Sequence, residues 1–198
     1  MSLIDTSYFV GPLTVAQLGQ TSVENALQLC IDQNEPEFLQ AVLGYELYDA
    51  FSAGVTASDP NYLNIKNGLG FVSTTNFPGY LPMWVYRNWY MNSKRKVQWV
   101  GFTPSTTPYQ SPIAAYVYFK YMRDLISQST GVGIVQAQPE NATAGVGQRK
   151  MVDAWNRMAS DIAGLWLYMS ALGTDVFPAY DITKIDFFRF TPINMFNI

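Results

Sequence analysis

The chain has 198 residues, enough for one domain whose hydrophobic core needs neither a disulfide nor a metal ion. Its 12 Lys and Arg residues against 15 Asp and Glu residues give a net charge of −3, which does not favour nucleic acid as a partner. The sequence contains no histidine, which excludes Ser-His-Asp and Cys-His nucleophilic sites and zinc sites that need imidazole; with Cys30 as the single cysteine, we expect no disulfide, metal cluster or cofactor.

Charged residues make up 14% of the chain and aromatic residues 15%, whereas soluble proteins usually carry roughly 25% charged residues. A monomer needs charge on its surface, and Tyr, Trp, Phe and Met are enriched at the cores of protein interfaces. The composition therefore indicates surface that partners cover. The alternative is an aromatic-rich core beneath a polar surface of Ser, Thr, Asn and Gln.

Three helices are predicted in the first third of the chain. A hydroxyl cap and apolar residues at helical spacing predict the first helix over residues 21–31. Pro36, which is tolerated in the first turn of a helix, predicts the start of a separate second helix that closes at Gly54. Asp59 and Pro60 open a third, short helix that ends at the next glycines.

Residues 71–110 break the helical pattern. They contain six glycines and prolines and predict a long excursion with two short strands, around Met83–Tyr90 and Lys96–Phe102. Long irregular segments in compact domains usually have a binding role or are disordered, and this many aromatic residues argues against disorder. We interpret the excursion as an interaction loop, whose candidate partner-binding residues are Trp84, Tyr86, Trp89, Tyr90 and Trp99.

Four of the twelve basic residues stand among these aromatic residues, namely Arg87, Lys94, Arg95 and Lys96. Cations that contact phosphate beside rings that stack on bases are the chemistry of single-strand binding. These four residues are therefore candidates for nucleic-acid contact. A solvated loop or an acidic protein partner explains the same residues.

Two longer helices are predicted in the second half. Ser111-Pro112 supplies a cap and a first-turn proline, and residues 113–126 are apolar at nearly every position, as in a helix buried on all sides. After a glycine-rich loop, apolar residues at helical spacing predict the last helix up to Gly173. The predicted core of these two helices consists of Ile113, Val117, Tyr121, Trp155, Met158 and Ile162.

The tail after Asp181 is apolar without a helical period. Its candidate partner-binding residues are Phe187, Phe188, Phe190, Met195 and Phe196. Exposing so many large side chains to water costs about 1.5–3 kcal/mol for each of them. We expect the tail to contact a different chain, as an irregular or short-stranded arm. The alternative is that it wraps its own helices and completes the core of one chain.

These elements predict a mainly α fold, a helical bundle of about four to five helices. Residues 1–180 form a single domain that includes the excursion at 71–110, and residues 181–198 form an extended C-terminal arm. The glycine pairs near 131 and 145 lack the strand and the Gly-Lys-Ser/Thr ending of a phosphate loop, and the carboxylates are scattered, so we expect no enzyme.

The most apolar stretches are about half of the ~20 residues that a helix needs to cross a bilayer. The first residues show no basic region followed by an apolar stretch, so no signal peptide is visible. We therefore expect a soluble protein that is made in the cytoplasm and does not contact a membrane.

Several segments resemble one family, in the same order. Residues 38–48, FLQAVLGYELY, resemble an N-terminal LLGYELY motif, and residues 111–124, SPIAAYVYFKYMRD, resemble its central helix. GVGIV at 131–135 and KMVDAWNRM at 150–158 follow. Over roughly residues 22–172 the chain is thus similar to uncharacterised virion proteins from tailed phages of gut bacteria, including the crAss-like group, which belong with the head–tail connector (adaptor) class.

The resemblance implies a structural virion protein, a ring-forming subunit at the portal vertex. Its implied partners are copies of itself in a twelve-fold ring, the portal protein, and tail or further connector proteins; contact with packaged DNA is a further expectation. The motifs consist of packing and turn residues and imply no active site. Two other functions stay open at this level: a nucleic-acid-binding accessory protein of the virion, and a small enzyme of unfamiliar type.

Overall fold

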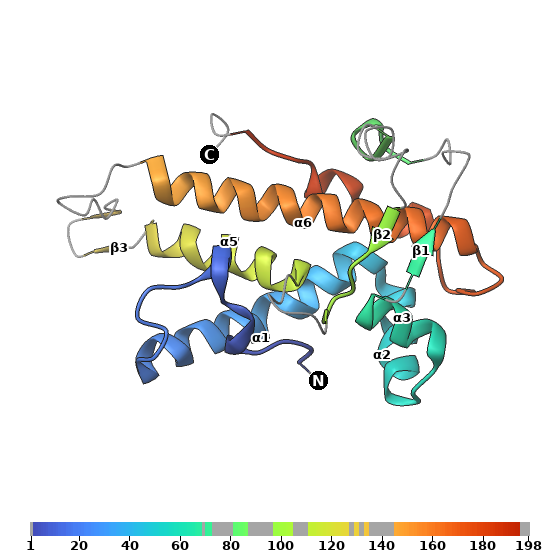
Figure 1. Cartoon of the computed structure of the whole chain (residues 1–198), viewed down its shortest axis with the longest axis horizontal. Helices are drawn as coiled ribbons and strands as arrows, with labels where there is room; N and C mark the ends of the chain where they lie inside the picture. The colour runs from blue at the N-terminus through green and yellow to red at the C-terminus, as the bar shows by residue number, and fades with distance from the viewer. Residues whose placement is uncertain are drawn as a thin grey trace.

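The structure is a computed structural model that describes residues 2–68, 70–72, 81–86, 97–104, 111–126, 129–130, 133–134 and 145–194. Within these ranges the chain is mainly helical, which confirms the predicted fold class. Three long helices form the bundle: α1 (Thr21–Leu43), α5 (Pro112–Ile126) and α6 (Gly145–Leu172). Helix α6 runs along the long axis of the molecule, α5 lies beside it, and α1 lies on the other side of α5 (Figure 1).

Helix α1 is continuous, so the prediction of two helices separated at Pro36 is wrong. A proline inside a helix costs about 3 kcal/mol. Packing outweighs this cost here, because the residues before and after the proline form one buried face: Leu27, Ile31, Phe38, Leu39, Val42 and Leu43. The break comes at Gly44, whose φ of 77° few other residues adopt, and α2 (Tyr45–Thr56) follows it directly.

Helix α3 (Pro60–Asn67) confirms the predicted third helix. The Asp59 side chain accepts a hydrogen bond from the backbone N–H of Asn61 at 2.8 Å, and Gly68 ends the helix in the left-handed conformation. A Cβ atom on Gly68 would lie 2.2 Å from the backbone of Val100. Only glycine therefore allows the end of α3 to meet the end of strand β2 (Val97–Trp99).

Strand β2 confirms the strand predicted around Lys96–Phe102, and it pairs antiparallel with β1 (Gly70–Val72). The strand predicted around Met83–Tyr90 is wrong in its described part, because residues 83–86 are helical. Pro82 suits the first turn of a helix, and its carbonyl accepts a hydrogen bond from the N–H of Tyr86 at 3.1 Å. A second antiparallel pair, β3 (Ser129–Thr130) with β4 (Gly133–Ile134), lies in the loop before α6.

The start of α5 after Ser111 and the end of α6 before Gly173 lie where the sequence predicts them, because a capping residue defines each. The Ser111 hydroxyl accepts a hydrogen bond from the N–H of Ala114 at 3.3 Å and donates one to the carbonyl of Phe102 at 2.7 Å. It thereby ties the start of α5 to the end of the excursion. At the end of α6, the N–H of Gly173 donates to the carbonyl of Met169, and Gly173 has a φ of 69°.

The predicted core is confirmed for five of its six members. Ile113, Val117, Met158 and Ile162 are fully buried, and Trp155 is buried as well. Tyr121 is only half-buried and packs at the edge of the core. Within the described ranges, no helix is both long and apolar enough to span a bilayer.

Both ends of the described chain lie against the bundle. Near the N-terminus, two 3-10 turns, η1 (Thr6–Tyr8) and η2 (Gly11–Leu13), pack on α1, α5 and α6. After α6 the chain forms two further turns, η3 (Ile182–Lys184) and η4 (Phe187–Phe190), and then runs back along α6 (Figure 1). Residues 181–194 therefore pack against the helices of the bundle.

Replacing Trp155 tests this core. Its ring lies 4.7 Å from the ring of Phe119 and 6.1 Å from that of Tyr116, between centroids. Trp155→Ala should lower the free energy of unfolding by about 3–5 kcal/mol, because it leaves a cavity between α5 and α6. Trp155→Phe is the control and should cost less, because it keeps an aromatic ring. Urea unfolding followed by circular dichroism measures both; an alanine variant within ~1 kcal/mol of wild type contradicts the assignment.

Candidate functional site: the C-terminal turn and a cationic cleft

The ring of Phe190, in turn η4, is fully buried and joins the three long helices. It makes an edge-to-face contact with Phe38 of α1 at 5.6 Å between centroids. It also lies 6.2 Å from Tyr116 of α5, and 6.4 Å and 6.3 Å from Trp155 and Trp166 of α6. Aromatic pairs at these distances stabilise a fold by about 0.5–1.5 kcal/mol each beyond the burial of their surface.

Side-chain hydrogen bonds hold the backbone that follows the turn. The indole N–H of Trp155 donates to the carbonyl of Thr191 at 2.9 Å. The amide of Asn156 pairs with the backbone of Ile193 in both directions, each time at 2.9 Å. These three bonds give the returning chain one register along α6.

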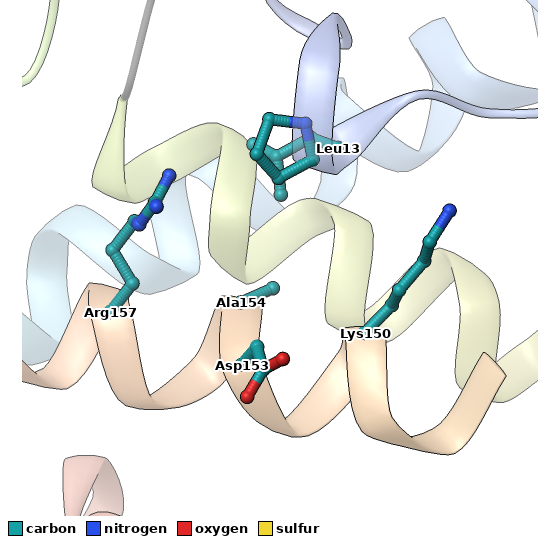
Figure 2. Close-up of a pocket in the computed structure, with 6 residues that line it drawn as sticks. Leu13, Lys150, Asp153, Ala154 and Arg157 are labelled. Atoms are coloured by element: carbon teal, nitrogen blue, oxygen red, sulfur yellow. The ribbon is translucent and has the colours of Figure 1, made fainter. Parts of the chain in front are cut away.

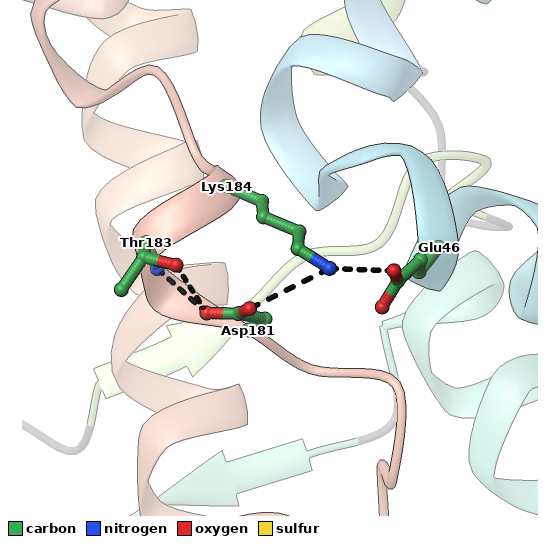
Figure 3. A network of polar contacts seen from close by, with 4 residues as sticks. All are labelled: Glu46, Asp181, Thr183 and Lys184. Atoms are coloured by element: carbon green, nitrogen blue, oxygen red, sulfur yellow. Dashed lines mark hydrogen bonds and ion pairs between the residues drawn. The ribbon is translucent and has the colours of Figure 1, made fainter.

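Ion pairs connect the tail to α1 and α2. Lys184 donates to the carboxylate of Glu46 at 2.5 Å and lies 3.6 Å from Asp181, whose carboxylate also accepts from the hydroxyl and backbone N–H of Thr183 (Figure 3). The two hydrogen bonds from Thr183 lower the pKa of the Asp181 carboxyl. The hydrogen bond to Glu46 raises the pKa of Lys184. Exposed pairs of this kind add little stability, so their role is to fix position.

Arg189 makes a second set of polar contacts. Its guanidinium pairs with the carboxylate of Glu37 on α1 and donates to the hydroxyl oxygen of Tyr116 at 3.0 Å. Burial raises the pKa of Tyr116 to about 12, so this hydroxyl keeps its proton at neutral pH. Turn η4 is thus held by the packing of its rings and by the ion pair and hydrogen bond of Arg189.

The expectation that the tail lies on another chain therefore needs correction for part of it. Residues i and i+3 of a 3-10 turn lie on the same side, so Phe187 and Phe190 both face the bundle. Phe187 packs edge to face on Trp166 at 4.5 Å between centroids. Phe188 points away and is 84% exposed, more than any other large apolar side chain in the described ranges. Of the predicted tail contacts in this turn, Phe188 keeps the surface that a partner could bind.

The two phenylalanines give a matched test. Phe190→Ala should lower the free energy of unfolding by about 3–5 kcal/mol, because a buried ring is lost from the junction of three helices. Phe188→Ala should change it by less than about 0.5 kcal/mol, because that ring lies in water. Thermal and urea unfolding of the full chain measures both. Equal effects of the two substitutions would contradict the described orientation of η4.

The aromatic candidates of the excursion also divide into buried and exposed residues. Trp99 is buried, and its indole N–H donates to the carbonyl of Ile65 at 2.8 Å, so it belongs to the core and is not available to a partner. Trp84 is half-buried, edge to face with Trp166 at 5.6 Å between centroids. Tyr86 is 38% exposed. These three share one predicted role because each is aromatic, whereas their burial depends on which helix faces them.

The other predicted contacts lie outside the described residues. They are the aromatic and apolar candidates Trp89, Tyr90, Met195 and Phe196 and the basic candidates Arg87, Lys94, Arg95 and Lys96. Their roles in binding a partner or nucleic acid stay predictions.

A buried carboxylate that sequence reasoning missed holds the N-terminal segment. Glu35 on α1 is only 3% exposed. Its Oε1 accepts a hydrogen bond from the N–H of Leu3 at 2.7 Å, and its Oε2 accepts from the hydroxyl of Ser2 at 3.0 Å and the N–H of Ile4 at 3.3 Å. The helix start predicted at Pro36 would place Glu35 in a first turn, where a carboxylate suits the helix dipole. Because α1 is continuous, Glu35 instead lies mid-helix and binds a second segment.

Burial raises the pKa of Glu35, although its hydrogen bonds oppose the shift. Burial also raises the pKa of Asp161 on α6 to about 7, against the charge of Arg157, which lowers it. A carboxyl whose pKa is higher in the folded state binds its proton more tightly there. Its protonation therefore stabilises the fold below the unfolded pKa, and this contribution is lost as the pH rises through the folded pKa.

The raised pKa of Glu35 predicts how the free energy of unfolding of the wild type and of Glu35→Gln should differ with pH. The free energy of unfolding of the wild type, minus that of Glu35→Gln, should fall as the pH rises above 4.5, the ordinary pKa of Glu35. Taking the difference cancels the contribution of Asp161, which both chains share. Glu24→Gln, in the first turn of α1, is the control. Urea unfolding at a series of pH values measures the slope; a rising difference would contradict the burial of Glu35.

Turn η2 and the first half of α6 enclose a cleft of about 290 Å³. Leu13 and Ala154 are buried beneath it, and the exposed Pro12 forms part of its wall. Lys150 and Arg157 reach from α6 on either side of the Leu13 turn, while the carboxylate of Asp153 points away from it (Figure 2). The lining is therefore apolar in the centre with two cations at its ends. Within the described part of the chain, no carboxylate lies within 4.0 Å of the Lys150 or Arg157 nitrogens, although the charge of Arg157 acts on Asp161.

Among the described residues, no group of three or more His, Cys, Asp or Glu side chains converges as a metal site would require. Comparison with protein-family models, with curated proteins and with solved structures finds no match to this chain.

Proposed function

We propose that the protein is a structural subunit that assembles with copies of itself, and that its place is the head–tail connector of a tailed-phage virion. The observation that carries the proposal is Phe188. An ordered turn holds this ring 84% exposed, on a chain with 14% charged residues. Keeping a large apolar side chain rigidly in water is unfavourable, and a protein partner that buries it removes the penalty.

Two further large side chains support an assembly role. Met83 is 77% exposed and Tyr45 is 66% exposed, the first in the excursion and the second at the start of α2. Aromatic residues and methionine are the types enriched in the cores of protein interfaces. Held on ordered elements, they lose little conformational freedom when a partner binds.

The connector assignment itself comes from the resemblance in sequence. Three of the four segments that carry it, at 38–48, 111–124 and 150–158, belong to α1, α2, α5 and α6, the helices that make up the core. A family defined by core residues shares a scaffold, and its members differ on their surfaces. A ring of such subunits uses two different faces of each chain, one for each neighbour. The portal protein and tail components are the proposed partners above and below the ring.

Light scattering and electron microscopy of the purified full-length chain test this proposal. We expect a concentration-dependent change from single chains to a closed ring, with twelve copies as the resemblance implies. Mixing with the portal protein of the same phage should raise the fraction in rings, because the portal presents a matching symmetry. A chain that stays monomeric with and without portal, and that is missing from purified particles, would rule out the connector role.

A further inference from the structure

The cleft between η2 and α6 has an apolar centre, and the exposed ring of Phe188 is an apolar side chain that lacks a partner surface among the described residues of its own chain. The cleft has a central apolar area, formed by Pro12, Leu13 and Ala154, and a volume of about 290 Å³. Burying one aromatic side chain removes about 150–250 Å² of surface from water. Because Phe188 is 84% exposed, it does not occupy the cleft of its own chain.

The charges around the two features are opposite. Four carboxylates and two cations belong to the surface around η4, a net charge of −2: Glu37, Glu46, Asp181 and Asp186 against Lys184 and Arg189. The lining of the cleft carries Lys150 and Arg157 against Asp153, a net charge of +1; Asp161, four residues after Arg157, has a pKa raised to about 7 by burial and is only partly ionised at neutral pH. Asp186, which caps η4, is exposed two residues before Phe188 and so places a carboxylate beside the ring.

Both surfaces are formed in advance. Phe187 and Phe190 pack on the bundle and Arg189 pairs with Glu37, so the turn that carries Phe188 is fixed before any partner arrives. Lys150 and Arg157 stand seven residues apart on one helix, about 10.5 Å along its axis. A surface that needs no rearrangement loses less free energy on binding.

We infer that the Phe188 turn of one copy inserts into the Lys150–Arg157 cleft of the next copy. This inference rests on the proposed self-assembly and names the contact that produces it. The turn and the cleft are different surfaces, so the contact is heterologous: each chain uses its turn toward one neighbour and its cleft toward the other. Repeated at a suitable angle, such a contact closes into a ring.

Two variants of the full-length chain separate the two halves of the contact. Phe188→Asn removes the ring from the turn and adds no charge that could pair with a reversed cleft. Lys150→Glu with Arg157→Glu reverses the charge of the cleft. All three positions are exposed, so both variants should fold, which circular dichroism checks. The controls are Leu29→Asn on α1 for the turn and Arg149→Glu with Arg123→Glu for the cleft, which make the same chemical changes at exposed residues outside both surfaces.

Each variant alone should lose ring formation, with an association constant at least about 10-fold below that of the wild type, whereas the controls should assemble normally. An equimolar mixture of the two variants should form dimers and nothing larger. In that mixture, one intact turn from the cleft variant meets one intact cleft from the turn variant, and neither chain can extend further. Light scattering after size-exclusion chromatography measures the masses.

The outcomes distinguish this contact from the proposed function. If the wild type forms rings and either variant assembles normally, the contact is wrong and the connector role stands. If both variants are monomeric and their mixture stays monomeric too, the turn and the cleft are not partners. If the wild type itself never assembles, the proposed function fails, and the contact fails with it.

Discussion

The packing of Phe190 is the interaction on which the rest of the structure depends. Rings from α1, α5 and α6 meet around it, and no two of these helices enclose it alone. A residue near the end of the described chain therefore completes a core that already includes Ile4 and Phe9 near its start. Because the ring is fully buried, the chain after α6 must return to the bundle. That return fixes the hydrogen bonds to Thr191 and Ile193 and the ion pairs of Lys184 and Arg189.

Helix α1 receives both ends of the described chain. Glu35 binds the backbone of the N-terminal segment, and Glu37, two residues later, binds the C-terminal turn. One carboxylate is buried and accepts several hydrogen bonds, as a buried charge requires, while the other is exposed and pairs with a cation. Continuity of the helix through Pro36 is what places these two carboxylates on different faces of one rigid element.

The 3-10 geometry of η4 converts a run of phenylalanines into two opposite functions. A period of three places Phe187 and Phe190 against the bundle and Phe188 in water. An arm free along its whole length would lose much conformational entropy on binding a partner. Here packing on the domain's own core already orders the turn, and the ring of Phe188 remains for contact with a partner. The same turn thus stabilises the monomer and, in the proposed assembly, presents the anchor.

The sequence by itself determined the elements that depend on local chemistry. Caps and first-turn prolines at Asp59 and Ser111, and glycines that can adopt positive φ at Gly68 and Gly173, define helix ends because their effect acts within a few residues. Continuous apolar spacing likewise identified five of the six predicted core residues of α5 and α6.

Only the tertiary structure decided what lies opposite each element. Pro36 predicts a helix start because the local cost of an internal proline is all that the sequence shows; packing over the whole length of α1 outweighs it. Trp99 and Phe190 resemble partner contacts in sequence, but helices far along the chain bury both. Glu35 and the cleft at Lys150 and Arg157 have no local signal, because the segments that complete them lie more than 30 residues away in the chain. Long-range packing is a property of the folded chain, and no window of sequence contains it.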